Sequence, residues 1–139
     1  MTLMLAPQTA IKPIPPDEQI VLGPITYVSH CARHGLPFFG HAYVGYVPTA
    51  ERLAPGTLRR MVQQAARHGE GALESKLGSM LQVCIKPAGV ALVTRSSHDC
   101  IGPRLLESEG ARRSTWHGRY RADRSLRTEF LARCDQGQA

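Results

Sequence analysis

Apolar residues follow a two-residue period in the first third of the chain. β-branched and aromatic residues crowd residues 20–31 (IVLGPITYVSHC), and Gly23-Pro24 interrupts them, which predicts a strand with a bend or bulge. Residues 41–48 (HAYVGYVP) alternate and close at a proline, so we expect a second strand paired antiparallel with the first. The connecting turn is predicted at residues 35–40 (GLPFFG).

The period changes to that of a helix after Pro55. Apolar side chains recur there at helical spacing: Leu58, Met61, Val62, Ala65 and Ala66. Two glycines in residues 67–73 (RHGEGAL) interrupt the pattern, so we expect a second helix from about Ala72 to Cys84.

The last third of the chain returns to strands and ends in a helix. Residues 89–100 (GVALVTRSSHDC) predict a third strand, and a loop followed by a fourth strand is expected within residues 104–121. Residues 123–134 predict a terminal helix with Asp123 or Ser125 as its N-cap. This order of elements predicts an α+β fold in which helices pack on an antiparallel sheet.

The chain of 139 residues is long enough for one domain with a modest core. Prolines mark residues 1–18 as an extended arm, residues 19–134 form the predicted folded domain, and residues 135–139 form a short tail. No apolar run approaches the roughly 20 residues of a membrane span, and no basic flank of a signal peptide precedes the first apolar patch. We therefore expect a cytoplasmic protein without a membrane partner.

The charge is strongly positive and comes mostly from arginine. The formal net charge is +6, and three of the 17 basic residues are Lys while the rest are Arg. Guanidinium groups suit bidentate binding of phosphate, which favours a phosphorylated small molecule as the ligand, with a solvated basic face as the alternative. Aromatic residues make up only 6% of the chain and form no stacking platform, so nucleic acid is not an expected partner.

Two pairs of potential metal ligands stand at the ends of predicted strands. Cys31 and His34 follow the first strand, and His98 and Cys100 end the third. Thiolate and imidazole are ligands that Zn²⁺ takes tetrahedrally, and a catalytic zinc site keeps one position for water. The alternative is a buried cysteine beside a surface histidine, and the spacing alone leaves both interpretations open.

Three segments resemble the GTP cyclohydrolase I family, and the resemblance runs from about residue 19 to residue 133. Residues 31–48 (CARHGLPFFGHAYVGYVP) are similar to the family's C-E-H-H motif, its Pro-Phe-Gly turn and its G-Y-x-P strand. Residues 86–100 (KPAGVALVTRSSHDC) are similar to its R-P-A-G-V…H-x-C segment, and residues 114–131 (STWHGRYRADRSLRTEFL) to its C-terminal pattern.

The resemblance implies a T-fold: an antiparallel sheet with two main helices on one face, assembled as a homo-oligomeric ring whose active sites lie between subunits. It implies that Cys31, His34 and Cys100 bind zinc. It also implies that His98 is the acid that protonates the imidazole ring of a purine while zinc-bound hydroxide attacks C8. The expected ligand is a small-molecule purine nucleotide or an analogue of one.

The chain departs from the family's pattern at several positions that would contact substrate. Arg33 stands where the family has a second catalytic histidine; arginine cannot give up a proton at neutral pH, but it can bind an anionic group or stabilise developing negative charge. Of the family's phosphate-binding residues, Arg60 and Arg104 remain. The carboxylate that reads the base is assigned to Glu70, with Glu74 as the second choice, and either could instead be a solvated helix charge.

Three further side chains receive structural interpretations. Cys84 is expected to be a small core residue on the apolar side of the second helix. Trp116 is expected to pack in the interior, and Cys134 has no evident partner in the sequence.

The leading hypothesis is a zinc-dependent cyclohydrolase that opens the purine ring of GTP or a related nucleotide, giving a formamide or continuing to formate and a dihydropterin. The first alternative is a divergent hydrolase for another purine or pterin-like substrate. The second is a non-catalytic purine- or pterin-binding subunit with the same fold. A related nitrile reductase or aldolase activity fits the zinc ligands poorly.

Overall fold

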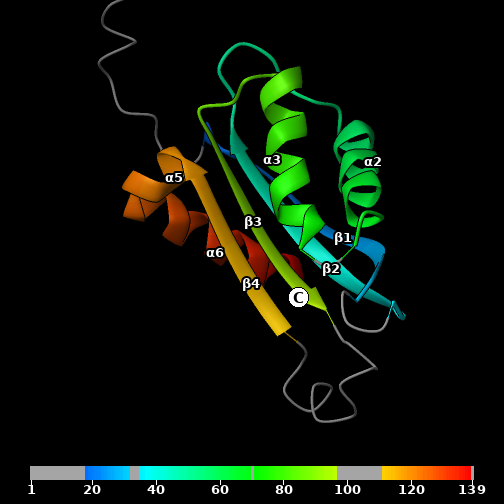
Figure 1. Ribbon diagram of the computed structural model, residues 1–139. Helices are drawn as coiled ribbons and strands as arrows, with labels where there is room; N and C mark the ends of the chain where they lie inside the picture. Colours follow the sequence, from blue (N-terminus) through cyan, green and yellow to red (C-terminus); the bar gives the residue numbers. More distant parts are fainter. Residues whose placement is uncertain (1–17, 32–34, 70, 97–110, 139) are drawn as a thin grey trace, which may run out of the picture.

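The structure, a computed structural model, describes residues 18–31, 35–69, 71–96 and 111–138 (Figure 1). Four strands form one antiparallel sheet in the order β1-β2-β3-β4. The strands are β1 (Ile20–His30), β2 (Pro37–Val47), β3 (Gly89–Ser96) and β4 (Ala111–Gly118). The helices are α2 (Pro55–Ala66), α3 (Ala72–Cys84), α5 (Arg119–Ala122) and α6 (Arg124–Gln138).

The predicted irregularity in the first strand is present in the sheet. Strand β1 pairs with β2 from Ile20 opposite Tyr46 to His30 opposite Pro37, and the register shifts between Leu22 and Ile25. A proline lacks the amide N–H that a strand ladder needs, so the ladder breaks at the Gly23-Pro24 step between those two residues.

The second strand begins earlier than predicted. The prediction assigned residues 35–40 to a turn, but β2 starts at Pro37, so Pro37 to Gly40 pair with the end of β1. Phe38 is buried in the core and Phe39 is exposed, which is the alternation of a strand.

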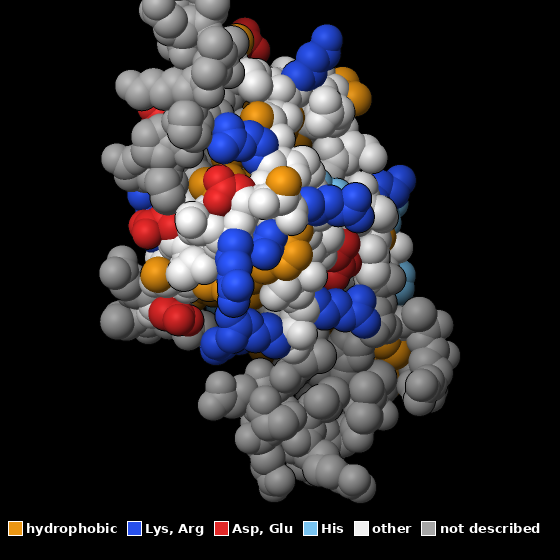
Figure 2. All heavy atoms as spheres, turned by 90° about the vertical axis from the view of Figure 1, so that its left-hand side faces the viewer, with side chains coloured by type: hydrophobic (Ala, Val, Ile, Leu, Met, Phe, Trp, Pro, Cys, Tyr) orange, Lys and Arg blue, Asp and Glu red, His pale blue; other side chains and the backbone are white. Residues whose placement is uncertain are grey.

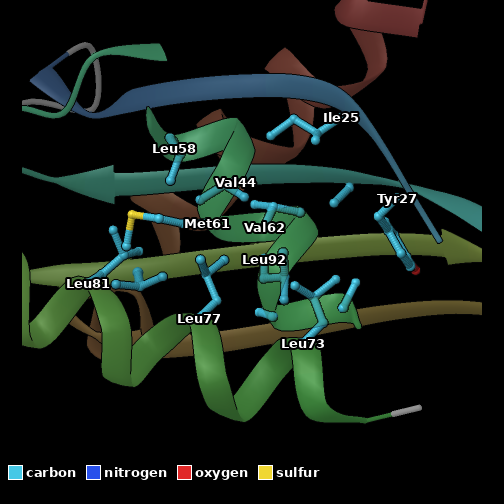
Figure 3. Close-up of a cluster of buried hydrophobic side chains, with 14 of the residues drawn as sticks. Ile25, Tyr27, Val44, Leu58, Met61, Val62, Leu73, Leu77, Leu81 and Leu92 are labelled. Carbon is cyan, nitrogen blue, oxygen red and sulfur yellow. The ribbon is translucent and has the colours of Figure 1, made fainter. Parts of the chain in front are cut away.

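Helices α2 and α3 cover one face of the sheet (Figure 1). Their buried side chains pack with those of β1, β2 and β3 in the larger core, and Tyr27 lies at the opposite end of that core from Leu58 and Leu81 (Figure 3). Pro55 begins α2, where a residue without an N–H is tolerated. The predicted pair of helices on one face is therefore confirmed.

Helices α5 and α6 lie on the other face of the sheet (Figure 1). The Asp123 carboxylate accepts a 3.1 Å hydrogen bond from the Leu126 amide, so Asp123 is the N-cap that the sequence offered as one of two choices. A second core joins this layer to the sheet, and Phe130 packs edge-on against both Trp116 and Tyr120. In the described part of the chain, no helix is both long and apolar enough to cross a membrane.

Candidate functional site

The carboxyl-terminal ends of strands β1 and β3 lie at the same end of the sheet. Both run antiparallel to β2, which lies between them, so their carboxyl ends point the same way. The register places Tyr27 of β1 and Ser96 of β3 on either side of Gly40. Two strand spacings amount to about 10 Å. The ends of β1 and β3, which the two predicted pairs of zinc ligands follow in the sequence, therefore lie close together.

Cys31 lies immediately after β1 and is only 2% exposed. Its amide donates a 2.9 Å hydrogen bond to the Leu36 carbonyl, and its carbonyl accepts one of 2.9 Å from the Gly35 amide. Its side chain belongs to the larger core. A buried thiol at this end of the sheet fits both interpretations of the sequence, a zinc ligand and a buried core cysteine.

The other residues of the predicted metal site lie outside the described residues: His34, His98 and Cys100. Arg33, Arg104 and Glu70 lie outside them as well. Within the described ranges, no three His, Cys, Asp or Glu side chains gather closely enough to hold a metal ion.

A small hollow, here named the polar cavity, lies between the sheet and the start of α3. Its volume is about 40 Å³. Its walls are formed by Tyr27, Ser29, Phe38, Gly69, Gly71, Leu73, Glu74, Thr94, Ser96 and Arg113. Most of the polar groups come from strands, and the two glycines flank Glu70 in sequence. Glu74, the second choice for the base-reading carboxylate, is therefore a wall residue of the polar cavity.

Tyr27 is the largest polar side chain of this cavity. Burial raises the pKa of its hydroxyl, and side-chain hydrogen bonds with Thr94 and Ser96 act in the opposite direction. Gly40 makes room for the ring, because a Cβ at this position would lie 2.8 Å from the Tyr27 hydroxyl oxygen. Tyr27 is thus a neutral hydroxyl fixed by its neighbours.

Ser29 differs from the other hydroxyls of the cavity. The residue is 5% exposed, and its Oγ has no hydrogen-bond partner among the described residues. Buried polar atoms in folded proteins nearly always have a partner, either a protein group or an ordered molecule. The Ser29 hydroxyl is therefore placed to bind something that enters the cavity.

Glu74 and Arg113 bring opposite charges to the cavity. One guanidinium nitrogen of Arg113 lies 3.7 Å from a carboxylate oxygen of Glu74, and their side chains are 54% and 18% exposed, respectively. Glu74 is in the first turn of α3 and Arg113 is on β4, an edge strand whose side of the molecule carries many Lys and Arg side chains (Figure 2). Glu74 thus lines the polar cavity and is mostly buried, rather than lying on a solvated helix face.

A larger hollow, here named the β1 groove, runs between β1 and α2. Its volume is about 560 Å³, and its walls include Tyr27 and Ser29, which also line the polar cavity. His30, Gln63 and Arg67 add polar groups. The Gln63 amide donates a 3.2 Å hydrogen bond to the Thr26 carbonyl and so joins α2 to the edge strand. Tyr27 and Ser29 thus lie between the β1 groove and the polar cavity.

The structure separates Arg60 from these hollows. Arg60 is exposed on α2 and lines neither the polar cavity nor the β1 groove of its own chain. Conversely, sequence reasoning did not select Tyr27, Ser29 or Arg113. For Tyr27 and Ser29, the signal in the sequence was the alternation of β1. Tyr27, Ser29 and Cys31 are two residues apart, and all three are buried.

A family model and related sequences agree on one family. A family model described as GTP cyclohydrolase I matches residues 5–135. A GTP cyclohydrolase 1 of Teredinibacter turnerae is 32% identical over 127 residues, which cover 88% of this chain and 69% of that protein. A GTP cyclohydrolase 1 of Bartonella henselae is 26% identical over 119 residues, covering 83% of this chain and 58% of that protein. The chain thus spans little more than half the length of some relatives that it matches.

A solved structure supports the fold alone. The archaeosine synthase QueF-Like in its apo form superposes with a TM-score of 0.58 over 73% of this chain and 94% of that chain, at 19% identity. The four-stranded antiparallel sheet with helices is thus the T-fold that the sequence led us to expect.

Proposed function

Because the chain belongs to the GTP cyclohydrolase I family, we propose that it is a zinc-dependent hydrolase that opens the imidazole ring of a purine nucleotide. GTP and a related purine nucleotide are both candidate substrates. The observation that supports the proposal is that β1 and β3 end at the same end of the sheet, because the buried Cys31 follows β1 there and the polar cavity is lined by Ser29 and Ser96 near the ends of the two strands.

In this proposal, Cys31, His34 and Cys100 hold Zn²⁺, and the donor set of two thiolates and one imidazole leaves a position for water. The ion, when bound, lowers the pKa of that water from 15.7 to about 7 and so makes a nucleophile available at neutral pH. His98 protonates the imidazole ring of the purine, since its unperturbed pKa is close to neutrality. Arg60 and Arg104 bind phosphate, with Arg60 serving a site completed by a neighbouring subunit.

Arg33, which replaces the family's second catalytic histidine, bears on the steps that would follow ring opening. Its guanidinium stays charged at neutral pH, so it binds an anionic group and transfers no proton. Release of formate and closure to a dihydropterin need further proton transfers. We therefore propose ring opening, and the experiment below determines whether the product is the formamide or a dihydropterin.

The proposal includes a homo-oligomeric ring in the cytoplasm. Two features of the described residues support the assembly. Strands β1 and β4 are the two edges of the sheet, and Val28 and Phe39, which are paired across β1 and β2, are 58% and 63% exposed. An exposed apolar pair next to an open strand edge is typical of a surface that another subunit covers.

The test is to incubate zinc-quantified protein with GTP and follow absorbance, fluorescence and mass. A mass gain of one water, or a pterin that fluoresces after oxidation, would support the hydrolase; the first result indicates a formamide product and the second the complete reaction. In the His98→Ala variant, zinc should stay bound and turnover should disappear. His41→Ala is the matched control, because His41 is exposed on β2. Turnover that persists without His98 would contradict its role.

If one zinc is bound per chain and GTP is unchanged, the same assay is repeated with GMP, guanosine and other purine nucleotides. Failure with every purine would contradict the purine hydrolase and leave two alternatives: a hydrolase for a pterin-like substrate, and a non-catalytic purine- or pterin-binding subunit.

A further inference from the structure

The side chain of Tyr27 crosses the sheet from β1 toward β3. The register places Tyr27 opposite Gly40 on β2, and Gly40 in turn opposite Ser96 on β3. A Cβ at Gly40 would lie 2.8 Å from the Tyr27 hydroxyl oxygen and 2.9 Å from its Cζ, so the far end of the ring lies over this glycine. Figure 3 shows the ring directed away from β1 toward β3. Because Gly40 has no side chain, the Tyr27 hydroxyl can reach the third strand.

The hydroxyl of Tyr27 binds two side chains of β3, an arrangement here named the Tyr27 bridge. It makes side-chain hydrogen bonds with Thr94 and Ser96, which are two residues apart and therefore project from the same face of β3. A phenolic hydroxyl both donates and accepts, so it can satisfy the two partners together. Tyr27 and Thr94 are both buried, and a hydrogen bond in such surroundings is stronger than one in water.

The Tyr27 bridge lies where the described part of β3 ends. Strands β1 and β3 are not neighbours, since β2 lies between them in the sheet. Ser96 is the last residue of β3, whereas β1 continues beyond Tyr27 to His30 and is followed by the buried Cys31. The bridge therefore joins β1 to the end of β3, next to the positions from which the chain continues past both strands.

A bridge at this place restricts how the end of β3 can move relative to Cys31. Backbone pairing holds β1 to β2 and β2 to β3, but the twist between neighbouring strands ranges from about 10° to 35° in magnitude among sheets. A side chain that is bonded across two strand spacings limits that freedom at one end of the sheet.

We propose that Tyr27 is a positioning residue: its hydroxyl, bonded to Thr94 and Ser96, holds the end of β3 at a fixed place relative to Cys31. It thereby sets the spacing of the groups that follow the two strands. In the proposed function these groups bind zinc, and to that extent the inference rests on that function. A tetrahedral zinc site needs its ligands in place, so a strand end that moves lowers the affinity for the ion. Tyr27 acts through the strands and is not itself a metal ligand.

Tyr27→Phe tests this role because it removes the hydroxyl and keeps the ring. Zinc affinity is measured by competition with a chromophoric chelator, and the absorption spectrum of the Co²⁺-substituted protein reports the geometry of the metal site. Tyr27→Phe should lower zinc affinity by about tenfold, the lower end of the range for groups that orient metal ligands. It should also change the Co²⁺ spectrum. Neither readout requires turnover of a substrate.

Tyr46→Phe is the matched control. Tyr46 is fully buried in the same core, and its hydroxyl accepts a 3.0 Å hydrogen bond from the Leu53 amide. It lies at the other end of the sheet, opposite Ile20 on β1 and Val90 on β3. Both substitutions remove a buried tyrosine hydroxyl and should lower the midpoint of thermal unfolding. Tyr46→Phe should nevertheless leave zinc affinity and the Co²⁺ spectrum unchanged.

Hydrogen exchange of the metal-free protein tests the Tyr27 bridge without zinc. Tyr27→Phe should accelerate amide exchange at the end of β3, from Thr94 to Ser96, more than at the start of that strand. Tyr46→Phe should leave exchange at the end of β3 unchanged.

The outcomes separate this inference from the proposed function. Unchanged zinc affinity in folded Tyr27→Phe, or an equal loss in Tyr46→Phe, would overturn the positioning role even if GTP is hydrolysed. Unchanged exchange at the end of β3 in Tyr27→Phe would overturn it as well, whether or not zinc binds. If the unmodified protein binds neither Zn²⁺ nor Co²⁺, the zinc-dependent hydrolase fails, and faster exchange confined to Tyr27→Phe still supports the hold of Tyr27 on the two strand ends.

Discussion

The Tyr120 hydroxyl donates a 2.6 Å hydrogen bond to Oε1 of Gln19, a residue 101 positions earlier in the chain. Gln19 is only 2% exposed, and its amide nitrogen donates in turn to the Leu126 carbonyl at 3.3 Å. Arg133 donates to the Gln19 carbonyl at 3.2 Å. The start of β1 is therefore joined to α5 and α6 by a buried polar network.

Tyr120→Phe should lower the free energy of unfolding by about 1–3 kcal/mol, because it leaves the buried Gln19 oxygen without its donor. The measurement is urea unfolding followed by fluorescence of Trp116, whose ring is 6.2 Å from that of Tyr120. Tyr43→Phe is the matched control: Tyr43 is also buried in the second core, and its hydroxyl has no hydrogen bond with another described residue. A Tyr120→Phe protein as stable as Tyr43→Phe would show that the network contributes little.

Gly40→Ala should destabilise the protein and disturb the polar cavity. A Cβ at Gly40 would lie 2.8 Å from the Tyr27 hydroxyl and closer still to the Arg95 carbonyl, so backbone would have to move. We expect a loss of about 1–3 kcal/mol, as for other overpacked sites. At Gly56, in the first turn of α2, nothing lies within 4 Å of such a Cβ. Gly56→Ala should therefore be neutral or stabilising, and equal effects of the two substitutions would contradict this account.

The described cysteines should differ in their reactivity. Cys84 is exposed, whereas Cys134 is buried and its environment raises the thiol pKa to about 12, first through burial and then through Asp135. Because thiolate is the reactive form, iodoacetamide at pH 8 should label Cys84 in the folded protein and leave Cys134 unlabelled. Peptide mapping by mass spectrometry gives the comparison, with urea-unfolded protein as the control in which both are labelled. Rapid labelling of Cys134 in the native state would contradict its burial.

The raised pKa of the Cys134 thiol predicts a loss of stability in alkaline solution. The pKa of Cys134 is higher in the folded protein than its ordinary value of 9.0, so the neutral thiol is favoured by folding. Its contribution to the free energy of unfolding is complete below pH 9 and is lost as the pH rises toward 12. Urea unfolding from pH 8 to 11 should show a shallower decline for Cys134→Ala than for the unmodified protein. Parallel curves would show that the thiol is not the responsible group.

Phe39→Ser should weaken the proposed ring. Phe39 is 63% exposed beside the β1 edge, so the substitution removes apolar surface that a neighbouring subunit would cover. Val83→Ser is the control, because Val83 is 80% exposed but lies on α3, away from that edge. Light scattering coupled to size-exclusion chromatography should show dissociation only for Phe39→Ser. A monomeric unmodified protein would contradict the assembly itself.

Much of the fold could be predicted because periodicity reports local structure. Strand β1 with its irregularity, helix α3 from Ala72 to Cys84, and the cap at Asp123 all follow from patterns within a few residues. The prediction for Cys84 was wrong: the buried positions of α3 are Leu73, Leu77 and Leu81, and burial continues at Ile85, just after the helix ends.

Helix α5 was missed for a tertiary reason. The prediction placed Arg119 to Arg121 within the segment of the fourth strand, but Gly118 adopts a positive φ of 62° and turns the chain. Tyr120 can then enter the second core, where it is fully buried. A short segment rich in arginine gives no helical period, so only its packing against the sheet defines it.

In the candidate site, too, some residues could be selected from the sequence around them, whereas others come together only through the pairing of distant strands. Cys31 could be selected from its motif, and Glu74 was the second choice for the base-reading carboxylate from the resemblance to the family. The Arg113 guanidinium joins Glu74 only because β4 pairs with β3 in one particular register, with Arg113 opposite Thr94. That register depends on the whole sheet, and no local pattern contains it.

The walls of the polar cavity come from all four strands and from the start of α3, so the cavity exists only in the folded chain. Any compound that occupies it must therefore shift the folding equilibrium toward the native state. A ligand present at 100 times its dissociation constant adds about 2.7 kcal/mol to the free energy of unfolding. Thermal melting in the presence of candidate compounds can thus rank substrates by affinity before any product has been detected.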